Sequence, residues 1–403
     1  MNIILSLLGI TLILGIFYLL SSNKKAINKA LIIKALLLQL VFALFIVKIP
    51  IGRQLVEWIS DIVSVALSYG SEGLVFVFGS LTADPSIFIV NVLAGIIFVA
   101  TLIGILNYFG IIEFIVTVVG GGLSKLLGVE KNESMVAVSN IFLGQTEAPL
   151  LLGGNKLSKM TDSQLTLVLV SGMGSISASI IVAYANMSAG ITMANLLTGC
   201  TLVPLSSIII SKLLVPETAT PGEIDKEEAE IMVDLKLKKA NGSLMNAISD
   251  SYMNAGQMVM AIAFSLVAII SLVALFNGIL GNFGLSLEGI VSYIFRPFAF
   301  LMGAQGEQAV IISELLASKL ITNEFVAFGS LAAVIDTFSP RMVAMSTVML
   351  LGFANFASIG ISLSGLSILA PNKKETLARL CPKAMIGGFA VSLLSALIVG
   401  LFI

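Results

Sequence analysis

Long apolar runs recur along almost the whole sequence, and they constrain the fold more than any other feature. A helix needs about 20 residues to cross the roughly 30 Å hydrocarbon core of a membrane, and apolar runs of that length recur between residues 3 and 403. The chain is 57% hydrophobic and only 11% charged, which is far from the balance of a water-soluble domain. These features predict an all-α polytopic membrane protein without a separate soluble domain.

Eight membrane-spanning helices are expected from the positions of these runs. The expected spans cover residues 3–20, 31–49, 87–110, 164–187, 190–211, 246–277, 342–371 and 384–403. Two of them contain polar interruptions, namely "SGMGSISAS" at 171–179 and "GFANFAS" at 352–358. We expect the helix to open at both interruptions.

Two regions break the spanning pattern in the same way. Residues 111–160 contain short apolar pieces around the polar tip "GQTEAP" (144–149), and residues 307–341 contain two short arms around a tip at Glu324. Apolar stretches of about 10 to 14 residues rarely span, so each region is expected to be a re-entrant helical hairpin. Each hairpin precedes an interrupted span and an intact span, and three crossings separate the hairpins. This order predicts inverted repeats, which are typical of secondary transporters with a binding site at the membrane midplane.

The remaining segments are more polar than the spans. Charges and Trp58 punctuate residues 51–81, which we expect to form an interfacial helix on the outer membrane surface, and a second interfacial stretch is expected at 285–305. Residues 215–242 are strongly polar, which predicts a cytoplasmic linker. The predicted domains are scaffold helices with an interfacial helix at 1–110, a first transport repeat at 111–213, the linker with a long scaffold helix at 214–284, and a second transport repeat at 285–403.

Basic residues predict the orientation of the chain. Four lysines lie between residues 24 and 34, after the first span, and a basic loop with Lys373, Lys374, Arg379 and Lys383 precedes the last span. The positive-inside rule places both loops in the cytoplasm and both termini outside. No positive charge precedes the first apolar run, so we expect a retained helix rather than a signal peptide.

Composition argues against several classes of function. The chain has no histidine, which removes Ser-His nucleophile pairs and His-ligated metals, and its two cysteines, Cys200 and Cys381, are isolated. An intramembrane enzyme is not expected, because there is no G-x-G-D string and Asp336 has no evident carboxylate partner. A channel is not favoured either, since rings of like charge and repeated carbonyl filters are not visible. The net charge of -1 does not suggest a protein that binds nucleic acid.

Each hairpin tip carries a carboxylate, Glu147 in the first and Glu324 in the second. A charge at the centre of a membrane helix costs about 2.5 to 3.5 kcal/mol, so such carboxylates are usually functional. Two acidic tips that enter from opposite faces would meet near the middle. The alternatives are that Gln145, Thr146 and Glu147 only satisfy their own hairpin's backbone, and that Glu324 is a solvated helix start with Asn323 near the N-cap.

The interrupted spans carry further polar groups. Asn355 and Ser358 lie three residues apart on one helix face and can donate to and accept from a polyhydroxyl solute; the alternative is that they hydrogen-bond a neighbouring helix. Neutral oxygens near the first interruption suit a monovalent cation better than Ca²⁺ or Mg²⁺. These candidate ion ligands are Asn140 just before the first tip, the Leu143 carbonyl, the Ser175 hydroxyl and the Ile176 carbonyl.

The segments "SEGLVFVFGSL", "GQTEAP", "ASKLITNEFVAF" and "GFANFASIGI" occur in this order and resemble the concentrative nucleoside transporter family. The family signature is Gly or Ala, any residue, Lys, any three residues, then Asn-Glu-Phe-Val-Ala and an aromatic residue or Met, and residues 317–328 meet it in full. The resemblance covers nearly the whole chain. It implies a homotrimer of eight-span protomers, in which an elevator-type transport domain moves against a trimeric scaffold.

The resemblance also implies roles for individual residues. It implies nucleobase contacts by Gln145, Thr146, Glu147 and Ile180, and ribose contacts by Glu324, Asn355 and Ser358, with Phe353 lining the pocket. It implies that Asn140, Leu143, Ser175 and Ile176 lie where sodium-coupled members bind the ion. At the start of the second hairpin the family often has a Trp and, two residues later, an acid, whereas this chain has Gly306 and Gln308.

We therefore expect a secondary-active symporter that imports nucleosides across the inner membrane by an elevator mechanism. Its expected partners are the nucleoside, membrane lipid and two further copies of the chain, without nucleic acid. Sodium is the expected coupling ion, and no other cofactor is expected. Two alternatives stay open: proton coupling, and the same fold carrying a free nucleobase or another ribosylated metabolite.

Overall fold

The computed structural model describes residues 2–84, 87–219 and 243–403. Within these ranges the chain folds into helices and contains no strand. Helices are expected in an apolar chain, because a helix satisfies its own backbone hydrogen bonds without water. The predicted linker falls mostly on residues 220–242, which lie outside the described residues.

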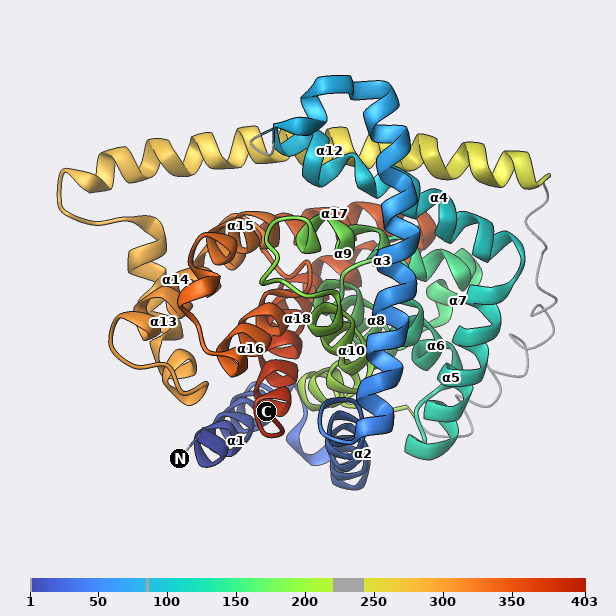
Figure 1. Cartoon of the computed structure of the whole chain (residues 1–403). Coiled ribbons are helices and arrows are strands. Elements are labelled where there is room, and N and C mark those ends of the chain that lie inside the picture. Colours follow the sequence, from blue (N-terminus) through green and yellow to red (C-terminus); the bar gives the residue numbers. More distant parts are fainter. Residues whose placement is uncertain (1, 85–86, 220–242) are drawn as a thin grey trace.

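The first three predicted spans are helices at nearly the predicted positions. They are α1 (Asn2–Leu19), α2 (Lys29–Val47) and the segment Ile89–Tyr108, in which a π-helical turn, Ile89–Leu93, leads into α4 (Gly95–Tyr108). Asn28 begins α2 as its N-cap, because its side chain accepts a hydrogen bond of 3.1 Å from the Leu31 amide. The long helix predicted at 246–277 is α12 (Leu244–Gly281), which runs along the upper edge of the molecule in Figure 1.

Between α2 and α4 lies α3 (Pro50–Phe78), the helix predicted to rest on the membrane surface. It runs down the front of the molecule in Figure 1 and is mostly exposed. Eight helical segments of the described residues are long and apolar enough to cross a membrane, and Pro50–Ala83 is one of them. Length and composition do not distinguish a crossing helix from an interfacial one, so the surface position of α3 stays a prediction.

The region of the first predicted repeat contains two short helices around a tip, then a broken helix and an intact one. Its elements are α5 (Ile111–Leu127), α6 (Lys131–Ser139), α7 (Gly153–Lys159), α8 (Asp162–Gly174), α9 (Ala178–Ala185) and α10 (Met193–Leu214). The predicted opening at 171–179 is confirmed, because the helix stops at Gly174 and restarts at Ala178. Ordinary capping chemistry starts this span: Thr161 and Gln164 form a capping box at the beginning of α8.

The region of the second repeat contains the same elements in the same order. They are α13 (Leu287–Leu301), α14 (Glu307–Ile321), α15 (Glu324–Val334), α16 (Pro340–Leu350), α17 (Phe356–Leu369) and α18 (Lys374–Val399). The predicted opening at 352–358 is also confirmed, because α16 ends at Leu350 and α17 begins at Phe356. Whether the two repeats enter the membrane from opposite faces stays a prediction.

One predicted boundary is wrong. We expected a basic loop before a last span at 384–403, but α18 begins at Lys374 and ends at Val399. The charged residues occupy one exposed face of its first turns, while Leu377, Leu380 and Cys381 are buried on the other face. Arg379 on the exposed face forms an ion pair of 2.5 Å with the Asp162 carboxylate at the start of α8. The mean hydropathy of this stretch is low, but its helical periodicity is intact.

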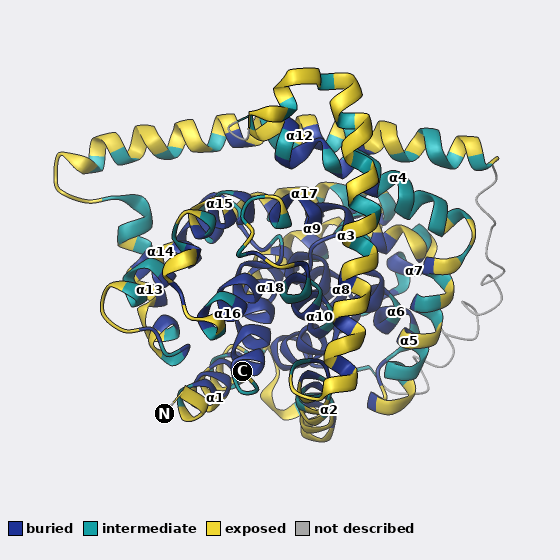
Figure 2. Cartoon of the chain, viewed as in Figure 1, coloured by how far each residue is buried: buried dark blue, intermediate teal, exposed yellow. Residues whose placement is uncertain are grey.

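The buried centre of the molecule consists mainly of α8, α10 and α18, as Figure 2 shows. Both α1 and α2 pack against α10 and α18, whereas α4 packs along α12. Buried polar groups connect α2, α10 and α18. Gln39 of α2 donates to Ser206 of α10, and the hydroxyls of Ser206 and of Ser395 on α18 lie 2.8 Å apart. The helices that carry the predicted site are therefore held together by α18, with α1 and α2 against them.

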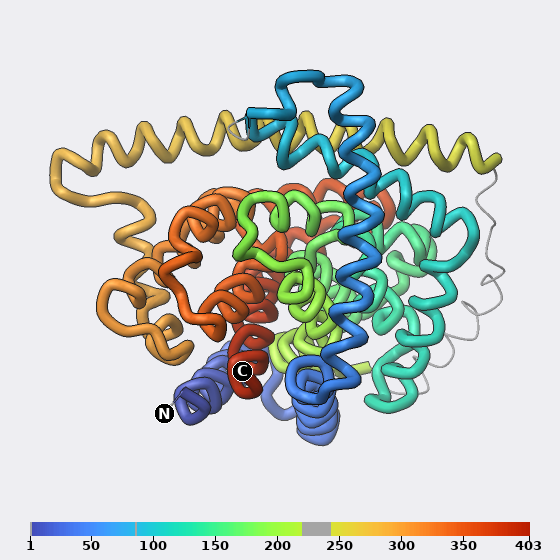
Figure 3. The backbone as a smooth tube through the Cα atoms, viewed as in Figure 1, coloured from blue at the N-terminus to red at the C-terminus, as the bar shows by residue number. Residues whose placement is uncertain are grey.

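The start of α1 and the end of α18 lie at the same end of the molecule (Figure 3). The guanidinium group of Arg341 joins them, because it donates to the Ser6 hydroxyl at 2.9 Å and to the Gly400 carbonyl at 3.2 Å. It also donates to the Met302 carbonyl at the end of α13, at 2.6 Å. One cation thus satisfies two helix C-termini that would otherwise leave carbonyls without partners.

Candidate functional site

The two broken helices contact each other at their breaks. The amide of Phe353, between α16 and α17, donates to the Ser175 carbonyl, between α8 and α9, at 3.2 Å. Next to this bond, a Cβ atom on Gly352 would lie only 2.7 Å from the Gly174 carbonyl oxygen, and Gly352 has a φ of +101°. Glycine is required here by both the backbone conformation and the close approach. A backbone carbonyl left unpaired by the first break is therefore satisfied by a backbone amide of the second break.

The tip of the first hairpin lies against both broken helices. The side-chain oxygen of Gln145 accepts a hydrogen bond of 3.2 Å from the Ser362 hydroxyl of α17. Glycines on both sides permit this approach: a Cβ on Gly365 of α17 would meet the Thr146 side chain at 2.8 Å, and a Cβ on Gly172 of α8 would meet Gln145 at 3.1 Å. Gln145 is buried and Thr146 is half-buried. The structure therefore brings both residues to the meeting of the two repeats.

Glu147 behaves differently from its two neighbours. Its side chain is exposed, and its carboxylate accepts a hydrogen bond of 3.1 Å from the Gly144 amide within the same tip. The predicted alternative, in which the tip residues satisfy their own hairpin, therefore describes Glu147 in this conformation. It does not describe Gln145, whose side chain bonds to α17.

Glu324 begins α15 at the tip of the second hairpin and is buried, with only 3% of its surface exposed. Asn323 caps the helix, as the alternative for Glu324 supposed, since its side chain accepts from the Val326 amide at 3.0 Å. The solvated helix start that we considered for Glu324 is wrong. One carboxylate oxygen accepts from the Tyr184 hydroxyl at 3.1 Å and the other from the Asn355 amide group at 3.3 Å. The carboxylate is thus held by groups from both repeats.

Asn355 and Ser358 organise the second break around this carboxylate. Asn355 is the N-cap of α17, because its side-chain oxygen accepts from the Ser358 amide at 3.0 Å while its NH₂ group donates to Glu324. The Ser358 hydroxyl donates to the Phe353 carbonyl, so both residues bond within the break. Both side chains are buried, and Phe353 is half-buried. Ile180 is buried on α9.

Three of the four predicted ion ligands lie together at the first break. The Ser175 hydroxyl donates to the backbone carbonyl of Asn140 and lies 3.3 Å from the backbone carbonyl oxygen of Ile176. The Asn140 NH₂ group donates to Ser171 at 2.9 Å, but its side-chain oxygen is buried and has no hydrogen-bond partner among the described residues. A buried oxygen without a donor fits a cation. Within residues 2–84, 87–219 and 243–403, no hydrogen bond joins the Leu143 carbonyl to this set.

Tyr184 is a site residue that the sequence did not lead us to predict. It is fully buried on α9, donates to Glu324, and stacks on Phe328 with ring centroids 4.2 Å apart. A signal was present, because Tyr184 lies four residues after Ile180 and therefore on the same face of α9. An aromatic residue in an apolar helix segment does not, however, indicate a polar partner distant in the sequence.

Lys319 is a second buried group whose role the sequence did not reveal, although it belongs to the family signature. Its ammonium group is fully buried and donates to the Met349 and Leu351 carbonyls at 2.9 and 2.7 Å and to the Ser392 hydroxyl at 2.8 Å. These carbonyls end α16, where the helix dipole favours a cation. Lys319 therefore fixes the first arm of the second hairpin to the second break and to α18.

The departure at the start of the second hairpin has a local explanation. Gly306 directly precedes α14 and has a φ of +56° with a ψ of -130°, a conformation that residues other than glycine rarely adopt. A Trp at this position would be strained. Gln308 lies in the first turn of α14, away from the tip at Glu324.

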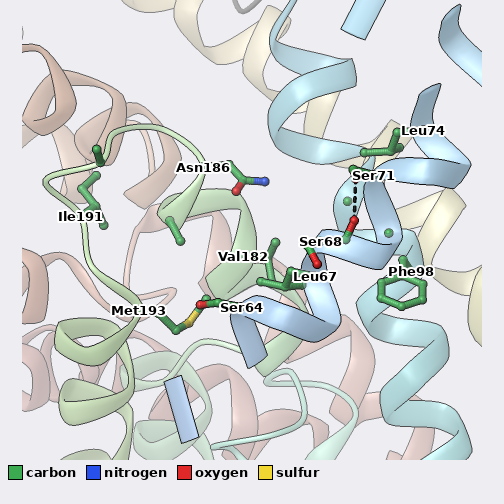
Figure 4. Close-up of a pocket in the computed structure, with 14 residues that line it drawn as sticks. Ser64, Leu67, Ser68, Ser71, Leu74, Phe98, Val182, Asn186, Ile191 and Met193 are labelled. Carbon is green, nitrogen blue, oxygen red and sulfur yellow. Dashed lines mark hydrogen bonds between the residues drawn. The ribbon is translucent and has the colours of Figure 1, made fainter. Parts of the chain in front are cut away.

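A cavity of about 460 Å³ lies between α3, α4 and α9 (Figure 4). Ser64, Ser68 and Ser71 of α3 line it, together with Phe98 of α4 and Asn186, which directly follows α9. None of the predicted site residues contributes to its lining. Tyr184 and Ile180 also belong to α9, but neither side chain lines this cavity.

Three family profiles match consecutive parts of the chain. The profile described as "Na+ dependent nucleoside transporter N-terminus" matches residues 8–81, the profile described as "Nucleoside recognition" matches residues 89–190, and the profile described as "Na+ dependent nucleoside transporter C-terminus" matches residues 195–400. Together they extend from α1 to the end of α18.

Relatives and solved structures agree with these profiles. The chain is 33% identical to the purine nucleoside transport protein NupG of Bacillus subtilis, with 100% of both chains covered, and 32% identical to the nucleoside permease NupC of Helicobacter pylori, with 99% of this chain and 97% of that protein covered. A structure of CNTnw in an inward-facing substrate-bound state superposes with a TM-score of 0.93 at 33% identity, covering 100% of this chain and 98% of that one. An outward-facing variant of CNTnw gives a TM-score of 0.93 at 32% identity, covering 100% and 99%. The chain therefore belongs to the concentrative nucleoside transporter family.

Proposed function

We propose that this protein is a secondary-active symporter that imports nucleosides, driven by an inward sodium gradient. The observation that carries the proposal is the buried carboxylate of Glu324, where the second hairpin meets both broken helices. An ionised carboxylate has about four acceptor positions, and two of them accept from Tyr184 and Asn355. The others can accept ribose hydroxyls through charge-assisted hydrogen bonds, which are stronger than neutral ones.

In this proposal the ribose binds at the second hairpin and the nucleobase at the first. Ribose contacts come from Glu324, Asn355 and Ser358, with Phe353 beside them. The nucleobase contacts are proposed for Gln145, Thr146, Glu147 and Ile180. The hydrogen bond from Ser362 to the Gln145 oxygen leaves the Gln145 NH₂ group to donate to the base. Glu147 is exposed and bonds within its own tip, so we place it at the edge of the pocket, in contact with the base through water.

Sodium is the proposed coupling ion, and its proposed ligands are the Asn140 side chain, the Ser175 hydroxyl and the carbonyls of Leu143 and Ile176. The buried Asn140 oxygen, which has no partner among the described residues, supports this choice. A cation there would join the tip of the first hairpin to the break between α8 and α9. Nucleoside binding to the same tip would then be strengthened by sodium, and sodium binding would be strengthened equally by the nucleoside.

The proposed transport mechanism is an elevator in a homotrimer within the inner membrane, with both termini outside. The candidates for a scaffold are α3 and α12, whose surfaces are mostly exposed, together with α4, which packs along α12. The sequence suggested that α1 and α2 also belong to the scaffold, but their packing on α10 and α18 favours assigning them to the moving part. The shared end of α1 and α18 is compatible with termini on one side of the membrane.

Uptake of labelled uridine and adenosine into proteoliposomes tests the proposal. The protein is reconstituted with an imposed sodium gradient, an imposed proton gradient or neither, alongside Glu324→Gln and Glu147→Gln variants. We expect accumulation with sodium only. The Glu324 variant should lose uptake, and the Glu147 variant, at the edge of the pocket, should be impaired less.

Each alternative has its own outcome in this assay. Accumulation with a proton gradient alone would replace sodium by protons. Competition by free bases as strong as that by nucleosides would show that the ribose is not recognised, and would assign the carrier to free nucleobases. Absence of gradient-driven uptake of either nucleoside would refute the proposed substrate class.

A further inference from the structure

Tyr184 joins the two repeats at the candidate nucleoside site. Its ring is fully buried on α9 in the first repeat, and its hydroxyl donates to the Glu324 carboxylate of the second repeat at 3.1 Å. The ring stacks on Phe328 with centroids 4.2 Å apart and an interplanar angle of 15°. It also contacts Phe325, with centroids 4.9 Å apart and an angle of 58°. All three of these partners belong to the first turns of α15.

The spacing of residues on α15 explains why a tyrosine fits this position. Glu324 and Phe328 lie four residues apart and therefore on one face of the helix. A tyrosine lying along that face can place its apolar ring on Phe328 and its hydroxyl on the carboxylate, because it combines an aromatic body with a polar end. The two aromatic contacts restrict rotation of the ring, so the hydroxyl points in one direction.

The hydrogen bond to Tyr184 controls the rotation of the carboxylate. One oxygen of Glu324 accepts from Tyr184 and the other from Asn355, so the two donors hold the carboxylate plane from both sides. An ionised carboxylate accepts at about four positions, so the two side-chain donors leave acceptor capacity for a ligand. A ribose presents neighbouring hydroxyls whose recognition needs two acceptors in a defined geometry. Without the tyrosine hydroxyl, one carboxylate oxygen would lose its side-chain donor, and the carboxylate could turn more freely about its terminal bond.

We propose that Tyr184 is a positioning residue for ribose recognition, which fixes the Glu324 carboxylate so that its remaining acceptor positions meet the sugar hydroxyls. The inference rests on the proposed function, since it assumes that Glu324 binds the ribose. Tyr184 does not contact the nucleoside itself in this scheme. It acts through Glu324, and it makes the distinction between ribonucleosides and deoxynucleosides depend on a contact between the two repeats.

Binding measurements on the purified full-length protein test this role. Affinities for uridine, 2′-deoxyuridine and 3′-deoxyuridine are measured by isothermal titration calorimetry for the wild type and for Tyr184→Phe, which keeps the ring contacts and removes only the hydroxyl. We expect uridine to bind about tenfold more weakly to the variant, the loss typical of one hydrogen bond to a charged group. The wild type should prefer uridine to at least one deoxynucleoside, and this preference should shrink in the variant.

Two controls separate positioning from a structural effect. Tyr252→Phe removes a tyrosine hydroxyl that also has a hydrogen bond, from Ser249 at 3.1 Å, but lies on α12 away from the site; it should leave all three affinities unchanged. If Tyr184→Phe does not fold, Phe328→Leu keeps the hydroxyl and removes the ring stack. That variant should also reduce the preference for uridine, because the ring is then less restricted.

The outcomes distinguish this inference from the proposed function. Equal weakening for uridine and both deoxynucleosides would overturn the positioning role, since a merely structural residue affects all ligands alike. Unchanged affinities in Tyr184→Phe would overturn it as well, while the proposed function would stand. A wild type that binds none of the three nucleosides would instead refute the proposed function.

Discussion

Substitution of Gly352 by alanine should separate the two broken helices. A Cβ at this position would lie 2.7 Å from the Gly174 carbonyl oxygen, 2.9 Å from its carbonyl carbon and 3.1 Å from the Met173 oxygen. All three atoms belong to the backbone, so no side chain can rotate away to make room. The substitution must therefore displace one break from the other and weaken the 3.2 Å hydrogen bond between the Phe353 amide and the Ser175 carbonyl.

The size of the effect has two contributions. Holding a residue other than glycine at the observed φ of +101° costs about 1 to 3 kcal/mol. Overpacking against fixed neighbours costs about 1 to 3 kcal/mol more. Gly352→Ala should thus lower the free energy of unfolding by about 2 to 6 kcal/mol, from these two terms together. Nucleoside uptake should fall as well, because Phe353 and Asn355 follow directly in the displaced segment.

Gly284→Ala is the matched control, because Gly284 also has a positive φ, +68°, but a Cβ added there would meet no neighbouring atom within 4 Å. This variant should lose only the conformational contribution, about 1 to 2 kcal/mol. The free energy of unfolding in mixed micelles and the initial rate of uridine uptake are measured for both variants. Equal destabilisation of the two variants with unchanged uptake would refute the close contact between the breaks.

Three further substitutions test buried polar contacts, each through the free energy of unfolding in mixed micelles. Lys319→Met should destabilise by about 2 to 6 kcal/mol, because it leaves the two helix-end carbonyls of α16 without a donor, at about 1 to 3 kcal/mol each. Glu133 of α6 forms a buried ion pair of 2.7 Å with Lys212 of α10. Glu133→Gln should cost about 3 kcal/mol, because the ammonium group of Lys212 stays buried without this counter-charge. Gln39→Leu should cost about 1 kcal/mol, because it removes the hydrogen bond from α2 to Ser206.

Exposed residues provide controls for these substitutions. Lys374→Met removes an exposed lysine at the start of α18, and Glu57→Gln breaks an exposed ion pair with Arg53, so each should change stability by less than about 1 kcal/mol. If Lys319→Met or Glu133→Gln were as mild as its control, the corresponding buried contact would not stabilise the fold. If Gln39→Leu left the free energy of unfolding unchanged, a specific attachment of α2 to α10 through this hydrogen bond would be refuted.

Local sequence was sufficient to predict most of the helical segments. Apolar length predicted α1, α2 and α12, and small or polar residues predicted the breaks at 174–178 and 350–356. These features depend on neighbours along the chain, such as helix caps and glycines. The start of α18 was misplaced for the opposite reason: charged residues lower the mean hydropathy from Lys374 onward, but they occupy one face of a helix whose other face is buried.

The candidate site was only partly predictable from the sequence. The tips and breaks identified Gln145, Glu324 and Asn355 as polar residues where lipid was expected, and the structure brings them to the meeting of the repeats. The exposed position of Glu147 was not predictable, because it depends on a turn within the tip. The partners of Tyr184 and Lys319 were not predictable either.

The sequence by itself determined where helices form, where they break and which residue types occupy the breaks, because hydropathy, capping and glycine conformations act over a few residues. Tertiary structure alone decided that Tyr184 donates to Glu324, 140 positions along the chain, and that Lys319 donates to a carbonyl at the C-terminal end of α16. It also decided that α1 and α2 pack on α10 and α18. The physical reason is that a buried polar group must find its partner wherever packing places one. That partner is set by the arrangement of whole helices, which no local pattern encodes.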